Sequence, residues 1–166
     1  GFGCDALDIG IIAAGALLQY VQETQRTALP HLRGMTLEQR DETLLMDAAT
    51  RRNLELDTSL TNNPKHTITG VLDRAVSGMG SRLFRRWLHR PLRDHNALRQ
   101  RHQAISALLD NHRFDDVHDQ LAGIGDCERI LSRVALRSAR PRDLARLRDA
   151  LAALPSLQHA MSSVDA

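Results

Sequence analysis

The chain has 166 residues, of which 42% are hydrophobic, 3% are aromatic and 25% are charged, with a formal net charge of +2. A core with so few aromatic residues must be built from Leu, Ile, Val and Ala, which favours packed helices over a β-sandwich. The two cysteines, Cys4 and Cys127, are far apart, which is typical of a reducing compartment. The longest apolar run, residues 9–18, is too short to cross a bilayer. We therefore expect a mainly α, cytoplasmic protein without a membrane partner.

The charge is unevenly distributed along the chain. Residues 1–28 contain one arginine and three acidic residues, whereas residues 82–148 contain 15 arginines and 8 acidic residues. Apolar residues recur at helical spacing from Ile9 to Val21 and predict a helix over residues 9–25. The change of charge, together with Pro30 after this helix, predicts a domain boundary near Pro30.

The sequence of the next third of the chain predicts both β-strands and helices. Apolar residues flank the polar run 38–43 and predict a short β-hairpin within residues 31–46. Asp47 is the predicted N-cap of a helix that extends to Leu56. Residues 57–69 are rich in Thr, Asn and Ser and predict a loop, and a short helical turn is expected over residues 71–76.

A short amphipathic helix is predicted to follow two glycines. Gly78 and Gly80 favour a tight turn, Ser81 is the predicted N-cap, and Pro91 ends the helix. One face carries the apolar residues expected to anchor this helix in a core: Leu83, Phe84, Trp87 and Leu88. The opposite face carries Arg82, Arg85, Arg86 and Arg90.

The remainder of the chain is predicted to be helical. Asp94 and Asp126 are predicted N-caps, and Pro141 suits the first turn of a helix. The last helix has an apolar stripe without a visible C-terminal partner, formed by Leu144, Leu147, Leu151 and Leu154. Because the chain also lacks an initiator Met, we expect it to be an excised fragment.

The arginine faces allow two interpretations. Arginine stripes neutralise phosphates in nucleic-acid-binding proteins, and the candidate contacts are Arg82, Arg85, Arg86, Arg140 and Arg142. Alternatively, the arginines pair within the protein, where the available acids are Asp126, Glu128, Asp143 and Asp149. The low net charge and the absence of interleaved aromatic residues favour the second interpretation.

Two further motifs resemble binding sites. The GMGSRL sequence at residues 78–83 resembles a phosphate-binding loop but lacks the third glycine of the dinucleotide fingerprint. Asp115, Asp116 and Asp119 have the D-D-x-x-D spacing of a Mg²⁺-diphosphate site. They are also placed where a helix dipole favours carboxylates, so a solvated acidic turn is the preferred interpretation.

Several stretches together resemble one protein family. They are LLQY at 17–20, TQR at 24–26, MDAATRRNLE at 46–55, GSR at 80–82 with RWLH at 86–89 and Pro91, ERILSRVALR at 128–137, and ARPRDL at 139–144. In this order they resemble the MutS family of DNA mismatch repair proteins, in particular its proteobacterial members. The DAATRRNLE and GSR…RWL…P motifs are specific markers of the family.

The resemblance implies a domain assignment. Residues 1–28 would be the last helix of the connector domain, and residues 29–166 the first, incomplete segment of the core or lever domain. In the family this mainly helical domain joins the ATPase to the DNA clamp, and a later segment of sequence completes it. The implied partners are the ATPase and clamp domains of the same chain, a second MutS subunit and mismatched duplex DNA.

The motifs that carry the family's activities are not found in this sequence. None of the three phenylalanines begins a Phe-x-Glu mismatch reader, and the one lysine, Lys65, is not in a G-x-x-x-x-G-K-[ST] loop. We therefore expect no enzyme activity, no metal and no cofactor in this chain, with ATP and Mg²⁺ bound elsewhere in the parent protein. The resemblance implies a mechanical lever, and the alternative is an autonomous arginine-rich module that binds nucleic acid.

Overall fold

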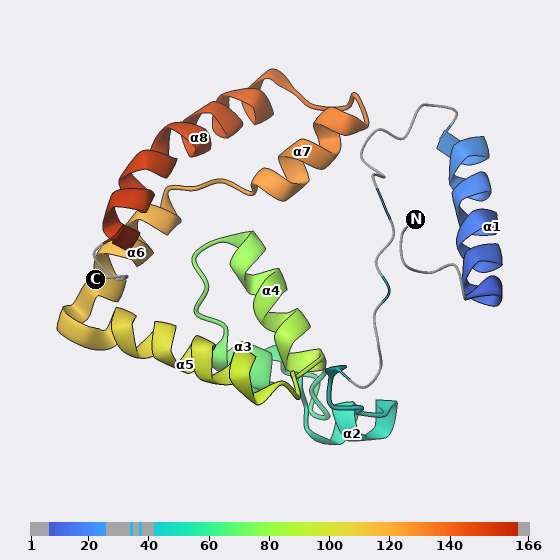
Figure 1. The fold of residues 1–166 in the computed structure, drawn as a ribbon, viewed down its shortest axis with the longest axis horizontal. Helices are drawn as coiled ribbons and strands as arrows, with labels where there is room; N and C mark the ends of the chain where they lie inside the picture. The colour runs from blue at the N-terminus through green and yellow to red at the C-terminus, as the bar shows by residue number, and fades with distance from the viewer. Residues whose placement is uncertain (1–6, 26–33, 35–36, 38–41, 163–166) are drawn as a thin grey trace.

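The structure, a computed structural model, describes residues 7–25, 34, 37 and 42–162 (Figure 1). The described residues are mainly helical, as expected. In chain order the elements are α1 (Asp8–Gln25), α2 (Ala48–Asn53), the 3-10 helix η2 (Pro64–His66), α3 (Ile68–Leu72), α4 (Gly78–His89), α5 (His95–Leu109), the 3-10 helix η3 (Asp110–His112), α6 (Arg113–Ala122), α7 (Cys127–Ala135) and α8 (Pro141–Ser162). None of the described helices is long and apolar enough to span a membrane.

The predicted β-hairpin is not formed by the described residues of the segment 31–46. Much of its first strand lies outside the described residues. Thr43 instead forms an isolated antiparallel bridge with Leu92. The Leu44 N–H donates to the Pro91 carbonyl (2.8 Å), and the Arg93 N–H donates to the Glu42 carbonyl (3.0 Å). The prediction was wrong here because backbone groups of residues 42–44 pair with a segment almost fifty residues away, and local alternation cannot indicate such a partner.

The predicted loop over residues 57–69 is confirmed in the main, and its base is closed by backbone hydrogen bonds. The Ile68 and Thr69 N–H groups donate to the Glu55 and Leu56 carbonyls, both at 2.9 Å. Gly70 allows the loop to close, because a Cβ there would lie 2.1 Å from the Pro64 carbonyl oxygen. Leu56 and Thr69 are 3% and 4% exposed and form a small core. The helical turn expected over 71–76 lies earlier in the chain, as α3.

The aspartate N-caps are confirmed. The Asp47 carboxylate accepts a hydrogen bond from the Thr50 N–H at the start of α2 (2.6 Å). Asp94 does the same for α5 and Asp126 for α7. A short polar side chain before a helix satisfies backbone N–H groups that have no partner within the helix, so these starts can be predicted locally.

The start of α4 differs from the prediction. Ser77 is the N-cap, and its hydroxyl accepts from the Gly80 N–H at 3.1 Å. Gly78 and Gly80 therefore lie inside the first turn of the helix rather than in a tight turn before it. Ser81, the predicted N-cap, donates its hydroxyl hydrogen to the Asp73 carboxylate instead.

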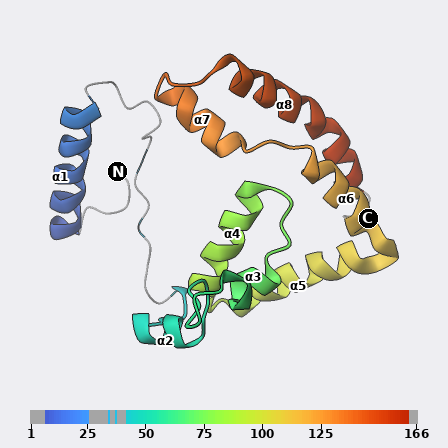
Figure 2. The same cartoon turned by 180° about the vertical axis from the view of Figure 1, so that it is seen from behind.

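The C-terminal helices pack together around α8. Figure 1 shows α8 running along α6 and α7, and its backbone packs extensively on both helices. Val117 of α6, Ile130 of α7 and Ala150 of α8 are the buried apolar residues of these helices, with exposures of 8%, 4% and 2%. Figures 1 and 2 show α4 inside the curve traced by α5, α6, α8 and α7.

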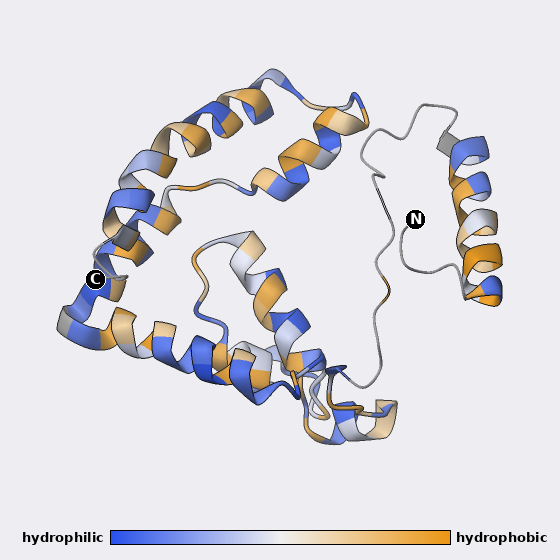
Figure 3. Ribbon diagram, in the orientation of Figure 1, coloured by the Kyte–Doolittle hydropathy of each residue, from blue (hydrophilic) through white to orange (hydrophobic). Residues whose placement is uncertain are grey.

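Part of the apolar stripe of α8 is exposed. Leu144, Leu151 and Leu154 are 51%, 55% and 45% exposed, and Met161 is 37% exposed. Figure 3 shows apolar residues recurring along the whole of α8. The apolar stripe of α8 therefore packs on α6 and α7 in part, while several leucines along it are not covered by the described part of this chain.

Candidate functional site

The most elaborate polar cluster of the described residues joins α4 to the start of α7. Both terminal nitrogens of Arg82 donate to the Asp126 carboxylate, each at 2.7 Å. The same guanidinium donates to Glu128 Oε2 from its η2 nitrogen at 2.7 Å and from Nε at 3.2 Å. Bidentate contacts between arginine and carboxylate are strong and directional. We call Arg82, Asp126 and Glu128 the Arg82 clamp.

The local sequence on both helices is suited to the Arg82 clamp. A Cβ at Gly78 would lie 3.0 Å from Asp126 Oδ2, so the glycine leaves room for the carboxylate. Asp126 Oδ1 also accepts from the Arg129 N–H at 3.2 Å, because Asp126 is the N-cap of α7. The same carboxylate therefore fixes the start of one helix and binds the guanidinium of another.

The electrostatics of the Arg82 clamp follow from these contacts. Hydrogen bonds from Arg82, and then from the Arg129 backbone, hold the pKa of Asp126 at about 2 despite partial burial, which acts in the opposite direction. The contacts with Asp126 and Glu128 raise the pKa of Arg82 above its ordinary value. The side chains of Arg82 and Asp126 are 34% and 25% exposed, so solvent screens them only in part.

A second ion pair joins α7 to α8. The Arg133 guanidinium donates to Asp143 Oδ1 at 2.7 Å, and the Asp143 side chain is 5% exposed. Asp143 Oδ2 accepts from the Arg140 N–H at 3.0 Å, which is the reciprocal half of a capping box at the start of α8. The Arg140 hydrogen bond and the neighbouring Arg133 lower the pKa of Asp143. This buried carboxylate is fully paired.

These contacts confirm the intramolecular pairing expected for four acidic residues. Asp126 and Glu128 pair with Arg82, Asp143 with Arg133, and Asp149 with the adjacent Arg148 at 2.6 Å. The choice of Arg82 as a partner, from 44 residues away, is not visible in the sequence. The Gly-Met-Gly sequence at residues 78–80 was the one local hint of this contact. In the structure Gly78 allows the Asp126 side chain to approach the helix closely.

The five candidate nucleic-acid contacts are divided between two helices. Arg82, Arg85 and Arg86 belong to α4, whereas Arg140 and Arg142 lie at the start of α8 (Figure 1). All except Arg82 are exposed. The Arg85 side chain is 57% exposed and approaches Asp73 at 4.0 Å. The structure thus places the five arginines on two separate elements rather than in one continuous stripe.

The apolar face of α4 is partly exposed in this chain. Leu83 and Trp87 are 42% and 43% exposed, while Phe84 and Leu88 are half-buried. The guanidinium of Arg101, from α5, stacks 3.7 Å from the centre of the Trp87 ring. A hollow of about 200 Å³ lies beside this pair and is lined by Glu42, Thr43, Arg86, Trp87, Arg90, Leu92 and Arg101. Trp87 therefore contacts a cation and solvent as well as apolar neighbours.

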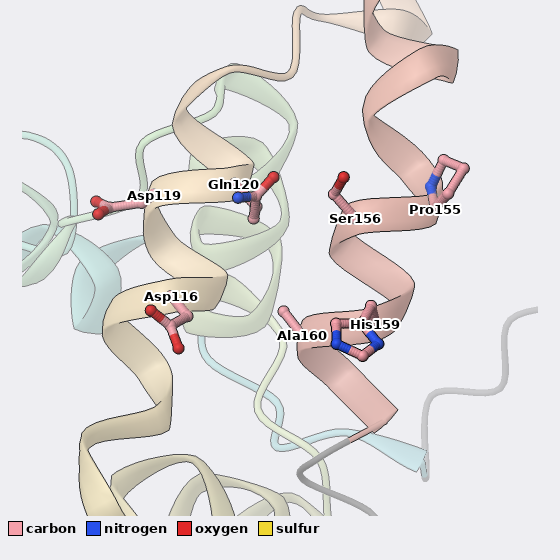
Figure 4. A pocket seen from close by; sticks show the side chains of 7 residues that line it. All are labelled: Asp116, Asp119, Gln120, Pro155, Ser156, His159 and Ala160. Carbon is pink, nitrogen blue, oxygen red and sulfur yellow. The ribbon is translucent and has the colours of Figure 1, made fainter.

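The acidic motif lies in α6, with Asp115 and Asp116 in its first turn as expected. Asp116 and Asp119 line an open groove of about 590 Å³ between α6 and α8 (Figure 4). In Figure 4 Asp119 points away from α8, whereas Ser156 and His159 come from the opposite wall. No group of three potential metal ligands occurs among the described residues, so the D-D-x-x-D spacing does not translate into converging carboxylates.

The comparison with known families agrees with the resemblance seen in the sequence. Residues 49–166 match the family model of MutS domain III. The match covers well over half of the chain and includes every helix from α4 to α8, the Arg82 clamp and the buried Asp143. It identifies a structural domain of a mismatch repair protein, so this chain belongs to the MutS domain III family.

Proposed function

We propose that this chain is the first segment of the lever of a proteobacterial-type MutS protein, and that it transmits nucleotide state to the DNA clamp. The observation that carries the proposal is the partly uncovered apolar stripe of α8. The helix packs on α6 and α7, yet Leu144, Leu151 and Leu154 of its apolar stripe are still about half exposed. An apolar stripe of this kind marks an interaction surface. The later segment that completes the domain in the MutS family is its proposed partner.

The proposed role requires stiffness and communication rather than chemistry. Several of the described helices have side-chain N-caps, ion pairs join α4 to α7 and α7 to α8, and α8 packs along α6 and α7, which suits transmission between two arrangements. A coupling free energy of about 1–3 kcal/mol between distant sites is typical of such transmission. ATP and Mg²⁺ would bind to the ATPase domain of the parent, which we place in the cytoplasm.

The N-terminal helix supports the same proposal. Ile9, Ile12 and Leu17 of α1 are 85%, 70% and 64% exposed. Such residues require a partner in the intact protein, and residues 1–28 as the last helix of the connector domain would have one. We therefore propose that residues 29–166 begin the lever and that the preceding helix belongs to a neighbouring domain.

The alternative function, an autonomous nucleic-acid-binding module, is favoured by the exposure of Arg85, Arg86, Arg140 and Arg142. A titration of fluorescent duplexes with the chain at two salt concentrations separates the two functions. The lever predicts weak binding, with equal affinity for a matched duplex and one carrying a single mismatch. The module predicts tight binding whose affinity falls steeply as the salt concentration rises, because binding releases counterions from the DNA phosphates.

The double variant Arg85→Gln, Arg86→Gln sharpens the titration. If these arginines contact phosphates, the plot of the logarithm of the binding constant against the logarithm of the salt concentration becomes less steep by about 2. Each phosphate contact contributes close to one to the magnitude of this slope. Arg148→Gln, which removes an arginine paired with its own neighbour Asp149, is the control. Tight, salt-dependent binding that requires Arg85 and Arg86 would overturn the purely mechanical role.

A further inference from the structure

The position of α4 relative to α7 is set by polar contacts rather than by a core. Among the described helices, extensive backbone packing joins α8 to α6 and α7, and α5 to α6, but does not join α4 to α7. Leu83 of α4 and Leu131 and Val134 of α7 are 42%, 54% and 40% exposed. These three side chains therefore contribute little apolar burial, and the Arg82 clamp is the polar contact that joins the two helices.

The contacts at the two ends of α4 differ in kind. At the C-terminal end, backbone hydrogen bonds of Leu44 and Arg93 join residues 42–44 to 91–93. His89 Nε2 also lies 2.9 Å from Asp57 Oδ2. At the N-terminal end, the contacts are made by side chains: the Arg82 clamp joins α4 to α7, and the Ser81 hydroxyl donates to the Asp73 carboxylate. A helix held by backbone hydrogen bonds at one end and by side-chain contacts at the other is suited to rotation about the first.

We propose that the Arg82 clamp is an ionic latch that holds α4 against the start of α7, and that its release lets α4 turn as a rigid helix about residues 90–94. The latch has two acceptors, Asp126 and Glu128, so the guanidinium is held in one orientation. Gly78 leaves space for the carboxylate of Asp126 in the latched position. The proposal concerns the geometry of this chain and does not depend on its role in the lever.

The expected displacement is large enough to measure. Met79 lies eleven residues before Arg90, which is about 16 Å along a helix, so a rotation of about 20° moves it by about 6 Å. Spin labels at positions 79 and 131, with Cys4 and Cys127 replaced by serine, report this displacement by pulsed electron paramagnetic resonance. Leu131 is suitable because it is 54% exposed on α7.

The wild-type chain is expected to give one narrow distance distribution. Arg82→Gln is expected to increase the mean distance between the two labels, or the width of its distribution, by about 5 Å, in keeping with the helix geometry. Asp126→Asn is the second variant, because Asn is as good an N-cap as Asp but lacks the charge. Arg82→Lys keeps the charge without the bidentate geometry and should give an intermediate result.

Arg148→Gln is the matched control, since it removes one arginine whose partner, Asp149, is the next residue on the same helix. Its distribution should equal that of the wild type. Far-UV circular dichroism checks that the helices persist in every variant. An unchanged distance in Arg82→Gln, or in a fully helical Asp126→Asn, would overturn the latch. Failure of the latch would leave the proposed lever function untouched, because that function is tested by the DNA titration.

Discussion

At the scale of single residues, several arginines of the chain act as internal partners of carboxylates. Arg82 illustrates this, because its guanidinium makes four hydrogen bonds to two carboxylates of another helix. A guanidinium in this arrangement would have to leave Asp126 before it could bind a phosphate. Arg85 and Arg86, one turn further along α4, are exposed, although Arg85 also lies 4.0 Å from Asp73, and they remain candidates for external contacts.

The lowered pKa of Asp126 predicts a pH dependence of stability. The carboxyl has an ordinary pKa of about 3.9 and a pKa of about 2 in the folded chain. The folded value is the lower one, so the stabilisation is complete above pH 4 and is lost as the pH falls from about 4 to about 2. We expect the Asp126 contribution, on the order of 1–2 kcal/mol after allowance for solvent screening, to disappear in this window.

This prediction is checked by urea denaturation of the wild type and Asp126→Asn at pH 5 and at pH 3. Other carboxylates titrate in both proteins, so the informative quantity is the difference in unfolding free energy between them. That difference should shrink at pH 3. A constant difference would show that the pairing of Arg82 with Asp126 adds no stability.

At the scale of elements, the helix starts depend on short side-chain contacts. Ser77 caps α4, and Ser77→Ala is expected to reduce the free energy of unfolding by about 1 kcal/mol, because the Gly80 N–H loses its acceptor. Ser77→Asp should retain most of the stability, since Asp is a comparable cap. Chemical denaturation followed by circular dichroism measures the effect, and equal stability of Ser77→Ala and wild type would contradict the assignment.

The same element shows why Ser81 was the wrong choice of cap. Serine at either position fits the pattern of a polar residue before an apolar run. The choice between them depends on Asp73, which accepts a hydrogen bond from the Ser81 hydroxyl and has a lowered pKa as a result. Because Ser81 already has this partner, the helix begins one turn earlier, at Gly78.

At the scale of the whole molecule, the exposed face of α8 is the feature through which the chain is expected to act on the rest of its protein. The double variant Leu151→Glu, Leu154→Glu, introduced into the full-length parent, places charge on this face and leaves the buried Ala150 unsubstituted. Mismatch binding without nucleotide should persist. The effect of ATP on DNA affinity should be largely lost, which for a coupling of 1–3 kcal/mol is a change of about 5- to 150-fold.

Leu60→Glu is the control for this experiment, because Leu60 is 57% exposed but lies in the loop over residues 57–69. The measurement is a competition titration of mismatched duplex with and without ATP. Full retention of the ATP effect in the double variant would refute the assignment of the α8 face as the coupling surface.

The sequence alone was sufficient for the features that depend on neighbouring residues. The mainly helical class, the caps at Asp47, Asp94 and Asp126, and the acidic residues that accept arginine were all predictable, because helix periodicity and capping act over a few residues. The family could also be recognised from short motifs, and the match to residues 49–166 supports that recognition.

Tertiary structure decided the features that join distant parts of the chain. It placed residues 42–44 against residues 91–93 instead of within a hairpin, and it paired Arg82 with carboxylates 44 residues away. It also gave Gly78 its role, which is room for Asp126 rather than a turn. The physical reason is that a carboxylate or a backbone carbonyl accepts a hydrogen bond from whichever donor the fold brings within about 3 Å, and local sequence patterns do not encode that proximity.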